Sequence, residues 1–106
     1  MVHCFGDYEA DEDRFELRRR GMAIPVQGRV LDTIFLLVRS GGKLVTKEAL
    51  IAGPWKGLAV GDGALNQAIM LARRVLASKD GQSPIATVRG KGFRFVAPVT
   101  NAGARP

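Results

Sequence analysis

The sequence contains little that could support covalent catalysis. His3 is its only histidine and Cys4 its only cysteine, and both lie at the N-terminus. No Ser-His-Asp or Cys-His arrangement can therefore be assembled around an ordered base. A single cysteine also excludes an internal disulfide and a multi-thiolate metal site. We expect no catalytic residue, no metal ligand and no cofactor.

Acidic residues and glycines offer two weaker candidates for a site. Six acids gather between Asp7 and Glu16. They could imitate paired carboxylates or a cation site, but an Asp-Glu-Asp run between two strands is usually a solvated turn. The glycine pairs at Gly61-Gly63 and Gly90-Gly92 lack the third glycine and the strand-then-helix context of a phosphate loop. These patterns do not indicate an enzyme.

Basic residues near the C-terminus are the stronger signal. Thr87, Arg89, Lys91 and Arg94 fall within eight residues, and no acid follows Asp80. Residues 1–16 carry a net charge of −5 and residues 17–106 a net charge of +11. Such a segregated positive field favours a polyanionic partner, and nucleic acid before an anionic membrane, because no basic amphipathic helix is evident. A protein that is merely basic and soluble is the alternative.

Length and composition limit the class of protein. A chain of 106 residues has room for one hydrophobic core, and its 46% hydrophobic residues are enough for folding. Its first residues lack the basic and apolar regions of a signal peptide, so we expect none, and no apolar run reaches the roughly 20 residues needed to span a bilayer. With one cysteine, a reducing compartment is the natural environment. We expect a cytoplasmic domain without membrane contact.

The elements that position the basic residues follow from periodicity and turn signals. Four short strands, over 3–5, 8–11, 15–19 and 22–26, predict an antiparallel meander. Apolar spacings of three and four then predict a helix over 30–38. Thr46 and Asp62 are suitable N-caps for two further helices. These helices, over 47–52 and 63–77, precede a hairpin with strands 85–88 and 93–96.

The third helix has two distinct faces. Its apolar ridge must face the core and consists of Leu65, Ala68, Ile69, Ala72 and Leu76. The opposite face carries Gly63, Gln67, Met70 and Arg74, with Leu71 on one flank and Asn66 and Arg73 on the other. A helix of this length fits the major groove of DNA, while a basic hairpin tip can reach the minor groove or phosphates.

Several segments together resemble the OmpR/PhoB-type winged-helix DNA-binding domain, and above all its N-terminal version in CadC-like regulators. They are 5–9, 30–38, 45–50, Trp55, 60–69 and the Thr-Val-Arg-Gly-Lys-Gly-Phe-Arg-Phe run at 87–95. The resemblance implies an α+β fold with a four-stranded N-terminal antiparallel sheet, three helices and a C-terminal β-hairpin wing. It also implies DNA binding by a bacterial transcription regulator, often with subunits aligned head to tail as homodimers on repeated sites.

The resemblance assigns roles to single positions. Arg89 matches the wing arginine that enters the minor groove, and Thr87 a phosphate contact beside it. Phe93 stands where tyrosine is usual, which keeps the ring but removes a hydroxyl. The loop 54–61 resembles a segment that contacts RNA polymerase in some members, although Trp55 within it suits a packing anchor better. The expected DNA-contacting set is Gly63, Ala64, Asn66, Gln67, Met70, Leu71, Arg73, Arg74, Thr87, Arg89, Lys91 and Phe93.

The third helix departs from the family where Met70 and Leu71 replace two usual arginines. We expect lower affinity and a weaker salt dependence. Either the two side chains contact thymine methyl groups, or they form an apolar patch that binds protein instead of DNA, or Leu71 turns into the core. We rank DNA binding first, with a winged helix repurposed for protein interaction as the alternative.

Domain boundaries complete the expectation. Residues 1–99 should form the winged-helix domain, and residues 100–106 a flexible tail or the start of a linker. By analogy with regulators that carry a sensing part, the chain is expected to be a fragment of a longer protein.

Overall fold

The computed structural model describes residues 1–56, 60–77 and 81–101. The chain begins with an antiparallel sheet of β1 (Val2–Phe5), β2 (Tyr8–Asp11), β3 (Glu16–Arg19) and β4 (Met22–Ile24). Each strand pairs with the next in chain order. The meander predicted from the sequence is confirmed, with strand ends shifted by one or two residues.

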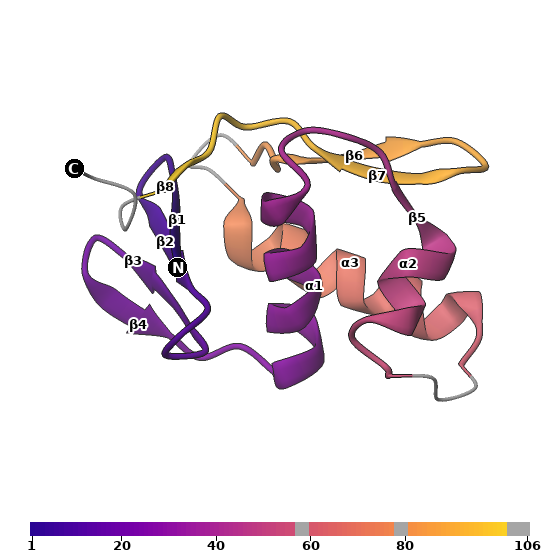
Figure 1. Cartoon of the computed structure of the whole chain (residues 1–106), viewed down its shortest axis with the longest axis horizontal. Coiled ribbons are helices and arrows are strands. Elements are labelled where there is room, and N and C mark those ends of the chain that lie inside the picture. The colour runs from indigo at the N-terminus through magenta and orange to yellow at the C-terminus, as the bar shows by residue number, and fades with distance from the viewer. Residues whose placement is uncertain (57–59, 78–80, 102–106) are drawn as a thin grey trace.

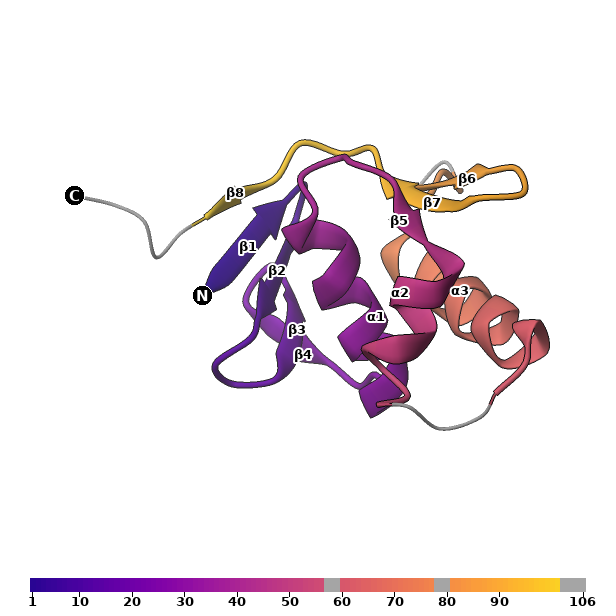
Figure 2. The same ribbon diagram turned by 45° about the vertical axis from the view of Figure 1, so that its right-hand side comes forward.

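A fifth strand, β8 (Thr100–Asn101), pairs with His3 and Cys4 of β1. The sequence predicted that Thr100 and Asn101 belong to a flexible tail, and for these two residues the prediction is wrong. Backbone hydrogen bonds to the open edge of β1 hold β8 in place. Because these bonds involve only backbone groups, β8 forms without apolar side chains. Figure 2 shows β8 beside β1. The remaining tail residues, 102–106, lie outside the described residues.

Three helices follow the sheet: α1 (Gly28–Arg39), α2 (Lys47–Ala52) and α3 (Asp62–Leu76). The Thr46 hydroxyl accepts a hydrogen bond from the Ala49 backbone N–H at 3.1 Å, which confirms the predicted cap of α2. Asp62 does not cap α3 as predicted, because Gly61 occupies that position. As the first helical residue, Asp62 instead places its carboxylate near the positive end of the helix dipole and 3.9 Å from Lys47 Nζ.

One core joins all layers of the molecule. α1 lies in the centre, with the N-terminal sheet on one side and α2 and α3 on the other (Figure 1). The fully buried side chains come from every layer and include Leu17, Ile34, Leu50, Leu65, Ile69 and Phe95. The Tyr8 hydroxyl donates to the Val75 carbonyl at 2.9 Å, which ties the end of α3 to the sheet. The position of α3 is therefore fixed from both the sheet and α1.

The C-terminal hairpin consists of β6 (Ile85–Val88) and β7 (Gly92–Phe95), and we call residues 85–95 the wing. Its turn needs glycine at Gly90, where φ is +74°. A short strand that the sequence did not predict, β5 (Val45–Thr46), pairs with β7 and completes a three-stranded sheet of order β5-β7-β6. A Cβ on Gly92 would lie 2.1 Å from the Val45 carbonyl oxygen, so this close pairing requires glycine.

Between α2 and α3 the structure describes residues 53–56 and 60–61. Trp55 is buried, and the Arg29 guanidinium lies 5.8 Å from its ring centroid. This confirms Trp55 as a packing anchor. Residues 57–59 of the predicted 54–61 loop lie outside the described residues. Among the helices of the described ranges, none has the length and apolar content needed to cross a membrane.

Candidate nucleic-acid interface

A groove of about 390 Å³ separates the exposed side of α3 from the wing. Side chains from three elements line it: those of α3, of the wing, and Lys47 at the start of α2. They include Lys47, Asn66, Met70, Arg73, Thr87 and Arg89. We call this hollow the α3–wing groove. It joins polar, cationic and apolar groups that are far apart in the sequence.

The outward face of α3 is the one that helical periodicity predicted. The ridge Leu65, Ala68, Ile69, Ala72 and Leu76 is buried against the core. Since side chains on the opposite side of the helix must then point to solvent, the exposed residues repeat with the same period. They are Asp62, Gly63, Asn66, Gln67, Met70 and Arg74.

Met70 and Leu71 do not form one patch. Met70 is 49% exposed and lines the α3–wing groove. Leu71 is half-buried, packs against the core, and lines a different hollow together with Arg29 and Trp55. Consecutive helical residues point about 100° apart, so the two side chains leave the helix in different directions. The alternative of one shared apolar patch is therefore weakened, and the alternative in which Leu71 turns toward the core is favoured.

The other predicted residues divide among three places. Those in the α3–wing groove are Asn66, Met70, Arg73, Thr87, Arg89 and Phe93. Ala64 and Gln67 line the hollow next to Trp55. Gly63, Arg74 and Lys91 are exposed, with Lys91 in the turn of the wing. Phe93 is only 5% exposed and contributes packing to the groove wall.

Arg73 connects α3 to the wing. Its Nη2 donates to Thr87 Oγ1 at 2.7 Å, and its Nε and Nη2 donate to the Ile85 carbonyl at 3.3 and 3.2 Å. Its guanidinium also lies 5.9 Å from the Phe93 ring centroid. The sequence placed Arg73 in the expected DNA-contacting set. In the folded chain its hydrogen bonds hold the hairpin against the helix.

Two residues of this region were absent from the predicted contact set. Lys47 lines the groove because β5 brings the start of α2 against β7, and the Lys47 N–H donates to the Lys91 carbonyl at 3.3 Å. In the sequence, the only indication of this role was that Lys47 directly follows the N-cap Thr46 and therefore begins α2. Arg94, counted with the basic string, instead donates from Nε to the Gly42 carbonyl at 3.1 Å. This hydrogen bond joins β7 of the wing to the turn that follows α1.

Acidic side chains gather at the opposite end of the molecule and are paired there. Glu9, Asp11 and Glu16 all contact the guanidinium of Arg18 on the sheet. Burial alone would favour the neutral form of Asp11, but hydrogen bonds from the Arg14 backbone and from Arg18 outweigh it and lower the pKa of this carboxyl. The same contacts, led by those to Glu16 and Glu9, raise the pKa of Arg18.

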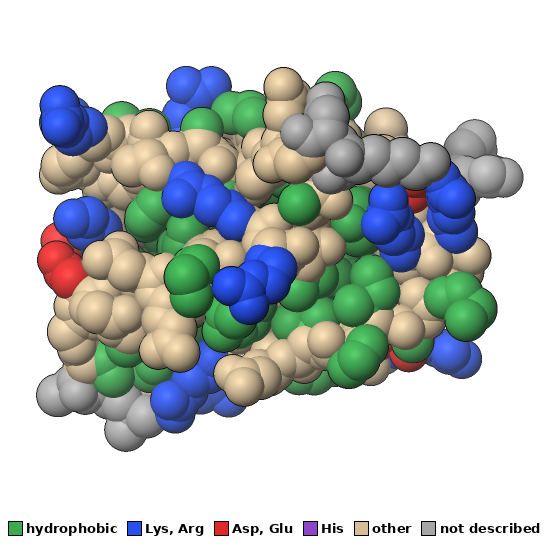
Figure 3. All heavy atoms as spheres, turned by 180° about the vertical axis from the view of Figure 1, so that it is seen from behind, with side chains coloured by type: hydrophobic (Ala, Val, Ile, Leu, Met, Phe, Trp, Pro, Cys, Tyr) green, Lys and Arg blue, Asp and Glu red, His purple; other side chains and the backbone are tan. Residues whose placement is uncertain are grey.

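The positive charge remains over α3 and the wing. Residues 81–101 contain no acid, and α3 contains one, Asp62 in its first turn. Figure 3 shows this face. Lys and Arg side chains lie at its upper left, where the wing is, and others lie near its centre, while few acidic side chains are visible. Apolar side chains lie between the basic ones. The face therefore combines positive charge with an apolar and polar middle, which suits a ligand that is both anionic and structured.

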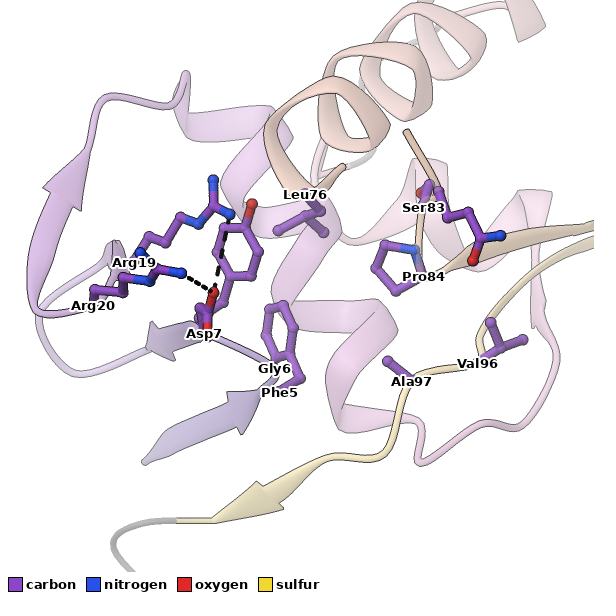
Figure 4. A pocket seen from close by; sticks show the side chains of 12 residues that line it. Phe5, Gly6, Asp7, Arg19, Arg20, Leu76, Ser83, Pro84, Val96 and Ala97 are labelled. Carbon is purple, nitrogen blue, oxygen red and sulfur yellow. Dashed lines mark ion pairs between the residues drawn. The ribbon is translucent and has the colours of Figure 1, made fainter. Parts of the chain in front are cut away.

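A second hollow, of about 620 Å³, lies between the N-terminal sheet and the end of α3. Phe5, Leu76 and Pro84 contribute apolar surface, and Asp7 pairs with Arg20 at 3.3 Å and with Arg19 at 4.0 Å at its rim (Figure 4). The Asp7 carboxylate offsets one of the two arginines, so the charged side chains of this hollow sum to +1, against +3 for Lys47, Arg73 and Arg89 in the α3–wing groove.

Comparisons with known proteins agree with this arrangement. The family described as "Transcriptional regulatory protein, C terminal" matches residues 21–95. The transcriptional activator CadC of Escherichia coli strain K12 is 28% identical over 86 residues, which are 79% of this chain and 17% of that protein. The chain thus spans about a sixth of the length of this relative.

Two solved structures show the same fold. The DNA-binding domain of E. coli CadC superposes with a TM-score of 0.79 at 23% identity, covering 93% of this chain and 94% of that one. The Klebsiella pneumoniae RstA DNA-binding domain, solved in complex with the RstA box, gives a TM-score of 0.74 at 23% identity, with 89% and 95% covered. The predicted winged-helix architecture is confirmed.

Proposed function

The chain belongs to the family of C-terminal domains of transcriptional regulatory proteins, and from this premise we propose that it binds double-stranded DNA as part of a bacterial transcription regulator. In this proposal α3 enters the major groove, and the wing contacts the adjacent minor groove and phosphates. The observation that supports it best is the α3–wing groove, where an exposed helix face and cationic side chains meet.

The phosphate contacts are assigned to four cations in and around the groove. Arg89 and Lys91 stand on the wing turn, where Gly90 lets the backbone approach a phosphate or the minor-groove floor. Arg74 is exposed on α3 itself, and the half-buried Lys47 lines the groove from the start of α2. Each phosphate that such a cation neutralises contributes about 0.9 to the slope of log affinity against log salt.

Wider parts of the function follow the family. We propose that the domain is not enzymatic, acts in the cytoplasm, and binds its site as a homodimer. We also propose contact with RNA polymerase through the loop 54–61, supported by the exposure of Lys56 next to the buried anchor Trp55.

The alternative of a repurposed protein-binding domain required Met70 and Leu71 on one surface, and it is weakened because they line different hollows.

The test is a titration of the isotope-labelled chain with random DNA duplexes at low salt, followed at each backbone amide. We expect shifts at residues 63–74 and 87–94. Shifts confined to the wing would indicate sequence-independent binding to the DNA backbone. If neither region shifted, the DNA proposal would be wrong.

A further inference from the structure

The middle of the exposed face of α3 carries no charge. Met70 lies one turn after Asn66 and one turn before Arg74, and Gln67, which lines the hollow next to Trp55, precedes Met70 by three residues. All four of these α3 side chains are exposed, and Met70 keeps 49% of its surface accessible. The helix therefore presents one thioether and two carboxamides where it would meet base edges.

These side chains match one kind of base pair. In the major groove, thymine offers an apolar group, its 5-methyl, and adenine offers the donor and acceptor that a carboxamide bonds at two points. Guanine is read best by arginine or lysine, which this stretch of α3 lacks. We propose that α3 selects A·T pairs, with Met70 packed against a thymine 5-methyl group. This inference rests on the proposed function and assigns its sequence class.

The surroundings of Met70 favour a nucleic acid over an apolar protein surface. Lys47 and Arg89 line the same groove, and Arg73 closes it toward the wing. Lys47 would keep Asp62 at 3.9 Å and Arg73 would keep its bonds to the wing, but an apolar partner would offer Arg89 no group to replace water. A DNA duplex brings phosphates to the rim and methyl groups to the floor, so each side chain meets a suitable group. The unbranched, flexible methionine can adapt to the exact position of a methyl group.

The test isolates a single methyl group. A duplex selected by the chain from a random pool is prepared with each thymine replaced in turn by deoxyuridine, which lacks only the 5-methyl. We expect at least one position to weaken binding about threefold to fivefold, the effect of one buried methyl group. In Met70→Gln this penalty should vanish at the same position. Met22→Gln, at an exposed methionine on β4, should retain it.

Three outcomes would overturn the inference. One is a selected duplex in which every deoxyuridine is tolerated, and another is a penalty that persists unchanged in Met70→Gln. In the third, the free chain self-associates, Met70→Gln abolishes the self-association, and deoxyuridine has no effect on DNA binding. That result would assign Met70 to a protein interface. In the first two cases, salt-dependent binding to random duplexes would still support DNA binding. Since Met70 is half-exposed, Met70→Gln should keep the wild-type thermal midpoint and amide spectrum.

Discussion

Arg73 Nη2 donates a hydrogen bond to Thr87 Oγ1 at 2.7 Å, and so joins the helix proposed to read bases to the wing proposed to hold phosphates. The two residues are fourteen positions apart in the chain. With the bonds from Arg73 to the Ile85 carbonyl, this contact holds β6 against α3. Thr87 is thus a wing residue whose hydroxyl already has a partner within the protein.

Replacing Arg73 with Gln should loosen the wing. We expect the affinity for DNA to fall several-fold while the salt slope stays close to that of the wild type, because the guanidinium is engaged by the wing. The measurement is affinity over a series of salt concentrations. Arg74→Gln, the exposed neighbour, is the matched control and should reduce the slope by about 0.9. A loss of that size in Arg73→Gln would instead identify Arg73 as a phosphate ligand.

Replacing Arg89 with Ala removes the cation at the wing turn. We expect roughly tenfold weaker binding at low salt and a salt slope smaller by about 0.9, since one phosphate or minor-groove contact is lost. Arg20→Ala removes the same charge from the N-terminal sheet, where Arg20 pairs with Asp7. Equal losses in the two variants would mean that net charge, and not the wing, governs binding.

Gly92→Ala should disrupt the pairing of β5 with β7. Because the new methyl group would lie 2.1 Å from the Val45 carbonyl oxygen, we expect a loss of about 2 to 4 kcal/mol in the free energy of unfolding, measured with urea. Gly63→Ala meets no atom within 4 Å and should stabilise the chain by up to about 1 kcal/mol. Similar midpoints for both variants would contradict the close approach at Gly92.

Arg18→Gln should lower stability in a pH-dependent way. The folded state lowers the pKa of Asp11, so its carboxylate stabilises the fold above the unfolded pKa, about 3.9, and this contribution disappears as the pH falls through the lower folded value. We expect wild type and Arg18→Gln to differ most near neutral pH and to converge in acid. Unfolding midpoints between about pH 2 and 7 provide the measurement. A difference that is constant across this range would show that the carboxylates do not depend on Arg18.

Sequence patterns determined the local elements and the two faces of α3. The apolar period of about 3.6 residues defines which side of a helix is buried, so the exposure of Asn66, Gln67 and Met70 could be predicted without coordinates. Thr46 as a cap and Gly90 in the wing turn were equally readable, because each acts on backbone groups within a few residues.

Tertiary structure alone decided the contacts between elements. The pairing of β5 with β7 and of β8 with β1 depends on which backbone edges meet in space, and short strands carry too few side chains to reveal this. Periodicity placed Arg73 on a flank of α3 and in the expected DNA-contacting set, but the wing lies against that flank and Arg73 donates hydrogen bonds to it. Met70 and Leu71 are neighbours in the chain, but their side chains leave α3 in different directions. Leu71 packs against the core, and Met70 points to solvent.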